Sequence, residues 1–274
     1  FRSRVEAIPG KGLGLVASRD IGYGEAILKE LPTILVADSV AQTLSDKDME
    51  CVLSQAVAGL SPSSKSAVEA QANCHPDLPR LIGTLITNTF GRRLDESGSI
   101  GSARALYNDI SRANHSCVPS ANYQSHFSYL EGTLHALHPI KAGEEITISY
   151  LDVLTSSLER QAILAEYAFV CQCECCSLSV AKSKRSDDRR TRLKAFLAPG
   201  AVHSAEDVDH ALHWASAEKL ASAEPDILLA GVAHHLSQGR TAQGRRWERR
   251  FRLACEAVCG EVSAEKEARL LGKS

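Results

Sequence analysis

Four of the nine cysteines in the 274-residue chain lie within six consecutive positions. They are Cys171, Cys173, Cys175 and Cys176, in the segment EYAFVCQCECC. Three thiolates with the spacing C-x-C-x-x-C can surround one ion from a single loop, and a zinc site takes four tetrahedral ligands. The spacing therefore favours Cys171, Cys173 and Cys176 as metal ligands. It leaves Cys175 over, because adjacent cysteines rarely reach the same ion.

The fourth ligand has to come from another part of the chain. Cys117 is the best candidate, because its segment NHSC is rich in turn formers. The remaining cysteines lie on predicted helices or at their ends, where a small buried side chain is the simpler interpretation: they are Cys51, Cys74, Cys255 and Cys259. A set of free thiols and a redox pair are the alternatives to a metal site in the cysteine-rich segment.

The composition is that of a globular chain without a strong charge bias. Hydrophobic residues make up 44% and charged residues 23%, and the formal net charge is −2. We therefore expect no direct nucleic-acid binding, and the lack of an apolar run of about 18 residues argues against a membrane span. The first residues, FRSRVEAIPGKG, lack the apolar core of a secretion signal. Together with clustered cysteines, this favours an intracellular location, in the nucleus or the cytoplasm.

The first half of the chain alternates between β-rich and helical patterns. Residues 3–40 predict short strands separated by glycine turns. Residues 45–90 have helical apolar spacing, with Ser45 as an N-cap and a last predicted helix that runs to Phe90. Residues 105–152 return to strands and hairpin turns. The pattern therefore predicts a helical insert between two β-rich parts.

The second half of the chain is predicted to be mainly helical. Residues 155–170 predict a helix that leads into the cysteines, and the composition shifts toward Ala, Leu, Arg and Glu after about residue 181. Ser204 and Asp207 have the spacing of a capping box at the start of a helix. The basic run KSKRSDDRRTR, residues 182–192, predicts a solvated face or a linker.

Four motifs follow one another in a fixed order along the chain. GKGLGL stands at residues 10–15, NHSCVP at 114–119, GEEITISY at 143–150 and YAFVCQCECC at 167–176. Each motif is weak alone, but in this order they resemble the SET-domain protein lysine methyltransferases, particularly the SET-and-MYND (SMYD-like) branch and its fungal relatives. The resemblance covers about residues 8–178.

The resemblance implies an α+β fold of small curved β-sheets around a knot-like crossing of the chain. Residues 1–155 would form the SET domain, with a helical insert at about 41–100. Residues 156–180 would form a zinc-binding post-SET segment. Residues 181–274 would form an all-helical C-terminal region, which makes one wall of the substrate cleft or a partner surface.

The function implied is that of a protein lysine N-methyltransferase that takes its methyl group from S-adenosylmethionine. Its partner would be a histone or non-histone protein or peptide that carries a lysine. Such catalysis depends on positioning the reactants and excluding water. Tyr150 matches the active-site tyrosine of the family, and Tyr107 resembles a tyrosine of its lysine channel; a core tyrosine is the simpler alternative for both. A non-catalytic SET-fold module for peptide binding or protein interaction is the alternative function.

The resemblance also implies which residues contact the cofactor. The main chain of Lys11, Gly12 and Leu13 would hold its methionine end, while Asn114 and His115 would bind its amine and adenine. Phe169 would stack on the adenine with Tyr167 beside it. A glycine turn, a satisfied polar turn and a helix C-cap are the structural alternatives for these motifs. The full set implied is Lys11, Gly12, Leu13, Gly14, Asn88, Asn114, His115, Tyr150, Tyr167 and Phe169.

In this family the zinc is structural, and it would be bound here by Cys117, Cys171, Cys173 and Cys176. Zinc would fold the tail back so that Phe169 closes the cofactor pocket. The chain departs from the family pattern at three places. Ser120 replaces an asparagine, Ile148 stands where many members carry Phe or Tyr, and residues 40–100 hold too few cysteines for the MYND zinc insert.

Overall fold

The computed structural model describes residues 2–94, 101–125 and 130–260 of the chain. Its strands are β1 (Ser3–Ile8), β2 (Gly12–Ala17), β3 (Ala26–Glu30), β4 (Ile34–Ala37), β5 (Phe90–Arg93), β6 (Ser102–Leu106), β7 (Asn114–His115), β8 (Ala121–Ser125), β9 (Gly132–Ala136) and β10 (Glu145–Ile148). They form a four-stranded sheet in the order β1-β2-β10-β7 and two three-stranded sheets, β3-β9-β8 and β4-β6-β5.

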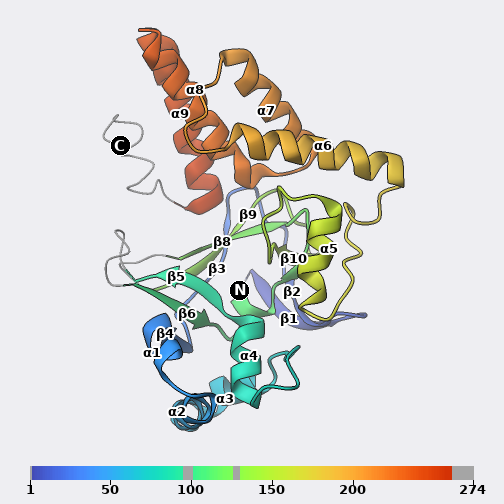
Figure 1. Cartoon of the computed structure of the whole chain (residues 1–274), viewed down its shortest axis with the longest axis vertical. Coiled ribbons are helices and arrows are strands. Elements are labelled where there is room, and N and C mark those ends of the chain that lie inside the picture. Colours follow the sequence, from blue (N-terminus) through green and yellow to red (C-terminus); the bar gives the residue numbers. More distant parts are fainter. Residues whose placement is uncertain (1, 95–100, 126–129, 261–274) are drawn as a thin grey trace.

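The helices lie on both sides of these sheets (Figure 1). They are α1 (Asp38–Thr43), α2 (Asp46–Ala58), α3 (Pro62–Glu69), α4 (Arg80–Asn88), the 3-10 turn η1 (Ile110–Arg112), α5 (Ser157–Ala165), α6 (Val180–Phe196), α7 (Ala205–Ala217), the 3-10 turn η2 (Ala221–Ala223), α8 (Glu224–Ser237) and α9 (Thr241–Cys259). Helices α1–α4 lie at one end of the molecule and α6–α9 at the other, with the sheets between them (Figure 1).

A short parallel strand pair joins two motifs that are far apart in the sequence. Asn114 of β7 pairs with Thr147 of β10, and His115 pairs with Ile148. The amide of Ser116 continues the pairing, since it donates to the carbonyl of Ile148 at 2.9 Å. On its other edge β10 pairs antiparallel with the glycine-rich strand β2. One sheet therefore brings the GKGLGL, NHSC and GEEITISY segments side by side.

The core of the sheets consists of aliphatic side chains that point inward from several strands. Leu15 of β2, Leu134 of β9 and Ile146 of β10 are almost completely buried and belong to one hydrophobic cluster. Full burial of such a side chain contributes about 1.5–3 kcal/mol to stability. The cluster fixes the position of β10, and Tyr150, which follows β10, packs against its surface.

The helical insert forms a cluster of its own against the sheet β4-β6-β5. Leu53 of α2, Val68 of α3 and Leu85 of α4 pack together with Leu106 of β6. Ser45 caps α2, as the sequence predicts, because its hydroxyl accepts a hydrogen bond from the amide of Asp48.

The predicted end of the last insert helix was wrong. Helix α4 ends at Asn88, and Phe90 begins strand β5, which pairs with Ala105 of β6. Pairing with β6 and burial against the aromatic rings of the core outweigh the local helical pattern at this residue.

The C-terminal helices pack consecutively against one another (Figure 1). Ser204 and Asp207 form the predicted capping box of α7. The interpretation of residues 182–192 as a linker was wrong, because these residues lie within helix α6. Arg190, Leu193 and Phe196 form one buried face of α6, and this spacing is typical of an amphipathic helix.

Helix α9 docks directly on the sheet β3-β9-β8. Asn122 of β8 donates its side-chain amide to the carbonyl of Val258 at 3.0 Å. Gly24 adopts a φ of +74°, and a Cβ there would lie only 2.8 Å from the Cβ of Ala257. This close approach requires a glycine both for its backbone conformation and for the space.

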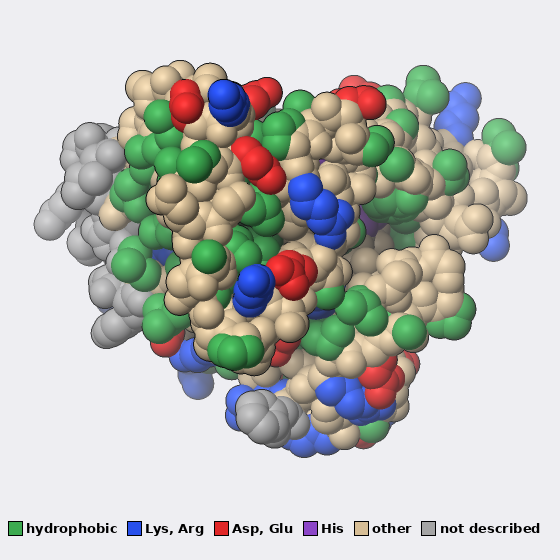
Figure 2. All heavy atoms as spheres, turned by 90° about the horizontal axis from the view of Figure 1, so that it is seen from below, with side chains coloured by type: hydrophobic (Ala, Val, Ile, Leu, Met, Phe, Trp, Pro, Cys, Tyr) green, Lys and Arg blue, Asp and Glu red, His purple; other side chains and the backbone are tan. Residues whose placement is uncertain are grey.

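The surface view in Figure 2 shows Lys and Arg side chains interspersed with Asp and Glu on the face that it presents. This mixture is consistent with the small net charge of the chain. Within the part of the chain that the structure describes, no helix is both long enough and apolar enough to span a bilayer.

Candidate functional site

Four cysteine sulfurs meet next to the end of β7. The Sγ atoms of Cys117, Cys171, Cys173 and Cys176 all lie within 4.8 Å of one another, and Cys117 and Cys176 are 3.5 Å apart. Four sulfurs bound tetrahedrally to one zinc ion would be separated by about 3.8 Å. None of the four forms a disulfide. This sulfur cluster could therefore hold one metal ion.

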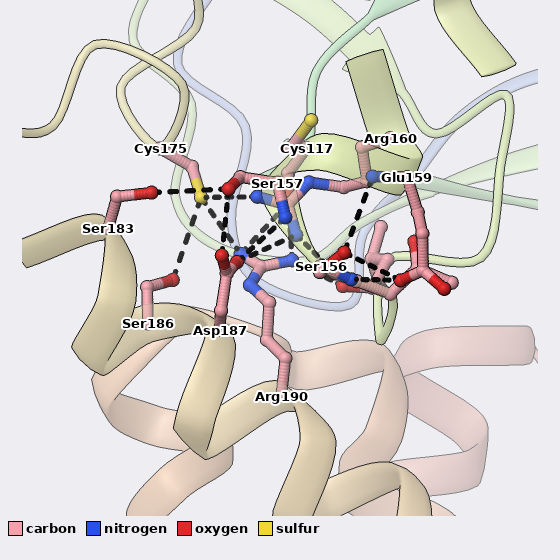
Figure 3. A network of polar contacts seen from close by, with 12 residues as sticks. Cys117, Ser156, Ser157, Glu159, Arg160, Cys175, Ser183, Ser186, Asp187 and Arg190 are labelled. Carbon is pink, nitrogen blue, oxygen red and sulfur yellow. Dashed lines mark hydrogen bonds and ion pairs between the residues drawn. The ribbon is translucent and has the colours of Figure 1, made fainter. Parts of the chain in front are cut away.

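The fifth cysteine of this region, Cys175, has a different environment. It is buried, and the guanidinium groups of Arg160 and Arg190 each donate a hydrogen bond to its sulfur at 3.4 Å (Figure 3). The cysteine spacing predicts no role for Cys175, and the sequence gives no sign that either arginine lies next to it. Both arginines lie in segments whose local pattern is that of an ordinary charged helix.

His115 connects the sulfur cluster to the neighbouring tyrosine. Its Nδ1 accepts a hydrogen bond from the amide of Tyr150 at 3.1 Å, which leaves the proton on Nε2. Nε2 lies 3.3 Å from the sulfur of Cys117 and therefore donates to it. Because the imidazole is buried and both nitrogens are engaged, the main chain of His115 is the part that can contact a ligand.

Three aromatic rings gather around this histidine. The ring centroid of Tyr150 lies 5.3 Å from that of His115 and 5.1 Å from that of Tyr167. Phe169 lies 6.2 Å from His115 and is 36% exposed. Between the two later aromatics, Ala168 adopts a φ of 57°, in the left-handed region, which turns the chain sharply after α5. The hydroxyl of Tyr150 donates to the carbonyl of Ala113 at 3.0 Å.

A carboxylate joins the polar residues on the other side of β7. The side-chain amide of Asn114 donates to Glu145 at 2.9 Å and to the carbonyl of Leu13 at 3.3 Å. Lys11 forms an ion pair with the same Glu145 at 2.6 Å. The structure thus brings together Lys11, Leu13 and Asn114. Sequence reasoning missed Glu145, although its place at the start of the predicted strand put it opposite the glycine-rich segment.

Gly12 and Gly14 of this segment have different surroundings. Gly12 has a φ of +77°, and a Cβ there would meet open space. A Cβ on Gly14 would lie 2.6 Å from Cγ1 of Ile8 and 2.8 Å from Nδ2 of Asn114. A side chain at Gly14 would therefore displace Asn114 from its bonds, while Gly12 is needed for its backbone conformation.

Tyr107 and Asn88 make their contacts away from the Asn114–Tyr150 group. Tyr107 is fully buried, and its hydroxyl lies 2.9 Å from that of Tyr123. The side-chain amide of Asn88 donates to the carbonyls of Ala72 and Thr84, each at 2.7 Å. Tyr107 lies behind Tyr123, and Asn88 holds the end of helix α4 against the preceding loop.

A pocket of about 350 Å³ lies on the other side of β10. Phe90, Tyr123 and Ile148 are among its lining residues, and Asp152 lines it with them. Leu137 lines this pocket and also a larger one of about 710 Å³, which reaches to helix α7. Sequence reasoning missed Phe90 and Tyr123 as site residues. No local pattern in the sequence distinguishes these two aromatic residues, because strand pairing with distant segments places them in the pocket wall.

Comparison with known proteins adds an independent observation. A protein-family model described as the SET domain matches residues 12–151, which is about half of the 274 residues. The match includes the glycine-rich segment, β7, β10 and Tyr150, and it ends before the three later cysteines of the sulfur cluster.

The curated relatives are similar over parts of their length. Histone-lysine N-methyltransferase set5 of Schizosaccharomyces pombe is 31% identical over 196 residues, which cover 70% of this chain and 56% of the yeast protein. Putative SET domain-containing protein L678 of Acanthamoeba polyphaga mimivirus is 26% identical over 62% of this chain and 75% of the viral protein. Histone-lysine N-methyltransferase SMYD3 of Mus musculus is 38% identical over 36% of this chain and 23% of the mouse protein. The chain thus spans about half the length of the yeast relative.

The tyrosines of the site give a testable pH dependence. Burial raises the pKa of Tyr107, Tyr123, Tyr150 and Tyr167 above the usual value. In the unfolded chain these groups titrate near about pH 10. The folded chain holds their protons more tightly. The contribution of these tyrosines to the free energy of unfolding is therefore fully present below about pH 10 and is lost as the pH rises toward the pKa values of the folded state.

We expect two results in a spectrophotometric titration of the phenolates. The folded protein should ionise these tyrosines only above about pH 10, and the free energy of unfolding should fall over the same interval. Normal ionisation of all the tyrosines with an unchanged native circular dichroism spectrum would contradict the burial of these rings.

Proposed function

The chain belongs to the SET-domain family, and from this premise we propose that it transfers a methyl group from S-adenosylmethionine to a lysine side chain of a protein. Its fold is the α+β arrangement of small sheets and helices expected from the sequence. The observation that carries the proposal is the grouping of three residues at one short parallel strand pair: Asn114 and His115 lie on β7, and Tyr150, two residues after β10, donates its amide to His115. Two relatives are named histone-lysine N-methyltransferases, and for this chain we propose a histone or another intracellular protein as the substrate.

The residues around β7 fit the cofactor chemically. S-adenosylmethionine, when bound, supplies a methyl group on a positively charged sulfur. The half-exposed ring of Phe169 offers an apolar face on which an adenine can stack, and Leu13 is also exposed beside Asn114. The carboxylate of Glu145, which is held by Lys11 and Asn114, orients the amide that would meet the polar end of the cofactor. The main chain at Gly12 is open to a ligand.

The pocket behind β10 fits a lysine stem. Phe90 and Tyr123 stand with their ring centroids 4.2 Å apart at its wall, and Ile148 separates it from the cofactor side. Aromatic walls exclude water from an aliphatic stem and attract its cationic end. Asp152 would attract the ammonium group to the pocket, and burial keeps the Tyr123 hydroxyl neutral by raising its pKa.

The two tyrosines predicted to be catalytic receive different roles in this proposal. The hydroxyl of Tyr150 donates to the carbonyl of Ala113 and its amide donates to His115, so its ring is fixed beside β7. We assign Tyr150 to the transfer site, where it positions the reacting groups. Tyr107 is a positioning residue, because its hydroxyl orients Tyr123 from behind.

We propose zinc as the ion of the sulfur cluster. Thiolate is a preferred zinc ligand, and four protein ligands leave no open position for catalysis. The ion would be structural: it would fix the loop that carries Cys171, two residues after Phe169, and so hold that ring near His115. Thiolates of this kind persist in a reducing compartment, and this favours a location in the nucleus or the cytoplasm.

A binding module without catalysis is the second candidate. The pocket of about 710 Å³ favours it, because Leu212 and Ala215 of α7 face Leu137 and Pro139 across a space that a peptide could fill. The same space would receive the residues that flank the lysine if the chain is an enzyme. The helical C-terminal region would provide the partner surface in both cases.

The first test is methyl transfer from labelled S-adenosylmethionine into a cell extract. We expect incorporation by the wild-type chain and a loss of about 100-fold or more with Tyr150→Phe, because the hydroxyl no longer fixes the reacting groups. Tyr23→Phe is the matched control, since Tyr23 is exposed and lines neither pocket, and it should keep the wild-type rate.

Two outcomes would contradict different parts of the proposal, namely the role of Tyr150 and the enzyme assignment. Full activity of Tyr150→Phe would show that the tyrosine has no part in the transfer. Cofactor binding by the wild-type chain without transfer to any protein would instead favour the binding module.

The second test is the metal content of the purified protein. Elemental analysis should find one zinc ion per chain, and Cys173→Ser should lose it because a tetrahedral site cannot be completed by three thiolates alone. Cys51→Ser is the control, since Cys51 is exposed on α2, and it should keep the ion. Equal zinc content in wild type and Cys173→Ser would contradict the site.

A further inference from the structure

Two arginine side chains lie fully buried beside the sulfur cluster. Arg160 comes from helix α5 and Arg190 from helix α6, and Figure 3 shows both guanidinium groups directed at the sulfur of Cys175. Cys175 immediately precedes Cys176, one of the four candidate ligands. A buried cation is costly unless opposite charge or hydrogen-bond acceptors compensate it, so the arrangement needs a physical reason.

Arg190 contacts four separate parts of the chain with one planar group. Its Nη1 and Nη2 each lie 3.3 Å from the carbonyl oxygen of the candidate ligand Cys117, and Nη2 also donates to Cys175. Its Nε donates to Glu218 at 2.9 Å, and Nη1 donates to the carbonyl of Val153. Arg190 therefore fixes the main chain of one candidate ligand and the loop of another from the C-terminal helices.

Glu218 anchors the other side of this contact. It caps the end of α7, is only 5% exposed, and accepts from the hydroxyl of Ser186 at 2.5 Å and from Nε of Arg189 at 2.6 Å. The carboxylate thereby joins α6 to α7. The buried guanidinium of Arg190 lies between this carboxylate and the cysteine loop.

Arg160 has less compensation from carboxylates than Arg190. Its closest acid is Asp187, at 3.8 Å, and Asp187 is already bound to the amide and hydroxyl of Ser157 at 2.8 and 2.7 Å. Nη1 of Arg160 donates to the carbonyl of Thr155, while its buried Nε has no hydrogen-bond partner among the described residues. The charge of Arg160 is thus better matched by the sulfurs than by any carboxylate within reach.

A divalent ion with four thiolate ligands is a dianion, and it would stand next to these two cations. We propose that Arg160 and Arg190 compensate the charge of the metal–thiolate site and so couple metal binding to the docking of helices α6 and α7. The proposal rests on metal binding by the sulfur cluster, but not on methyl transfer. Groups just outside the ligand shell orient the ligands and stabilise the ion in this way at other metal sites.

The coupling has a consequence for the larger pocket. Helix α7 contributes Leu212 and Ala215 to its wall, and Glu174 of the cysteine loop is paired there with Lys219 at 2.7 Å. Because coupling between two binding equilibria is reciprocal, loss of the metal should loosen α6 and α7 and with them this wall. The metal site would then shape the substrate cleft as well as the cofactor pocket.

The test measures the zinc dissociation constant of the full chain by competition with a chromogenic chelator in reducing buffer. Arg190→Met keeps much of the side-chain volume but removes the guanidinium group, and it should weaken zinc binding about 10- to 100-fold. Arg185→Met is the surface control, since Arg185 is exposed on the same helix α6. Leu53→Ala is the stability control, because it removes a buried side chain of α2, which packs in a cluster separate from the sulfurs and from α6 and α7.

Arg185→Met should keep the zinc affinity, and Leu53→Ala should lower the melting temperature while keeping that affinity in the folded protein. Equal zinc affinity in Arg190→Met and wild type would overturn the proposal, as would an equal loss in Leu53→Ala. If Arg190→Met does not fold, Arg160→Met takes its place, because it removes the other buried guanidinium at the sulfur of Cys175 and should weaken zinc binding in the same range. A wild-type chain that binds no zinc would overturn the metal site itself, whatever its methyl-transfer activity.

A second measurement uses the wild-type chain alone. Hydrogen exchange is compared before and after removal of zinc by the chelator. The amides of α6 and α7 should exchange faster without the metal, while those of α2, which packs in a separate cluster, should not change. Unchanged exchange in α6 and α7 would contradict the coupling.

Discussion

The pairing of β7 with β10 is the interaction on which the rest of the site depends. This two-residue contact places His115 between the amide of Tyr150 and the sulfur of Cys117. One imidazole thus fixes Tyr150, the proposed transfer-site tyrosine, with one nitrogen and a candidate metal ligand with the other. A small displacement of β7 would separate the cofactor side, the tyrosine and the sulfur cluster at the same time. The buried aliphatic core behind β10 gives this short pair the rigidity that its own hydrogen bonds could not provide.

The sulfur cluster connects this strand pair to two other parts of the chain, the segment around Phe169 and the C-terminal helices. On one side its loop carries Phe169, which approaches the same histidine. On the other side its neighbour Cys175 is bound by two buried guanidiniums, one of them from the C-terminal helices. The separate contact of α9 with the sheet at Gly24 shows that the helices are attached at two places. In the proposed account, the metal fixes the position of the cofactor pocket relative to the substrate cleft.

The sequence predicted those features that local patterns encode. The cysteine spacing selected three sulfurs that the structure places with Cys117, and the capping box at Ser204 marked a helix start correctly. The prediction failed where contacts between residues far apart in the sequence determine the local structure. The basic run was interpreted as a linker or a solvated face because of its charged composition, yet Arg190 lies on the buried side and contacts residues that are far away in the sequence. Phe90 likewise leaves a helical pattern because β6 offers it a strand partner.

The most direct test of the central claim is the binding of S-adenosylhomocysteine, followed by calorimetry, to the same preparation with and without its metal. If the sulfur cluster holds Phe169 in place, the metal-free protein must order the loop upon binding. Its affinity should then be lower by about tenfold or more. Equal affinity in the two forms, with metal removal verified by elemental analysis, would contradict the claim that the metal shapes the cofactor pocket.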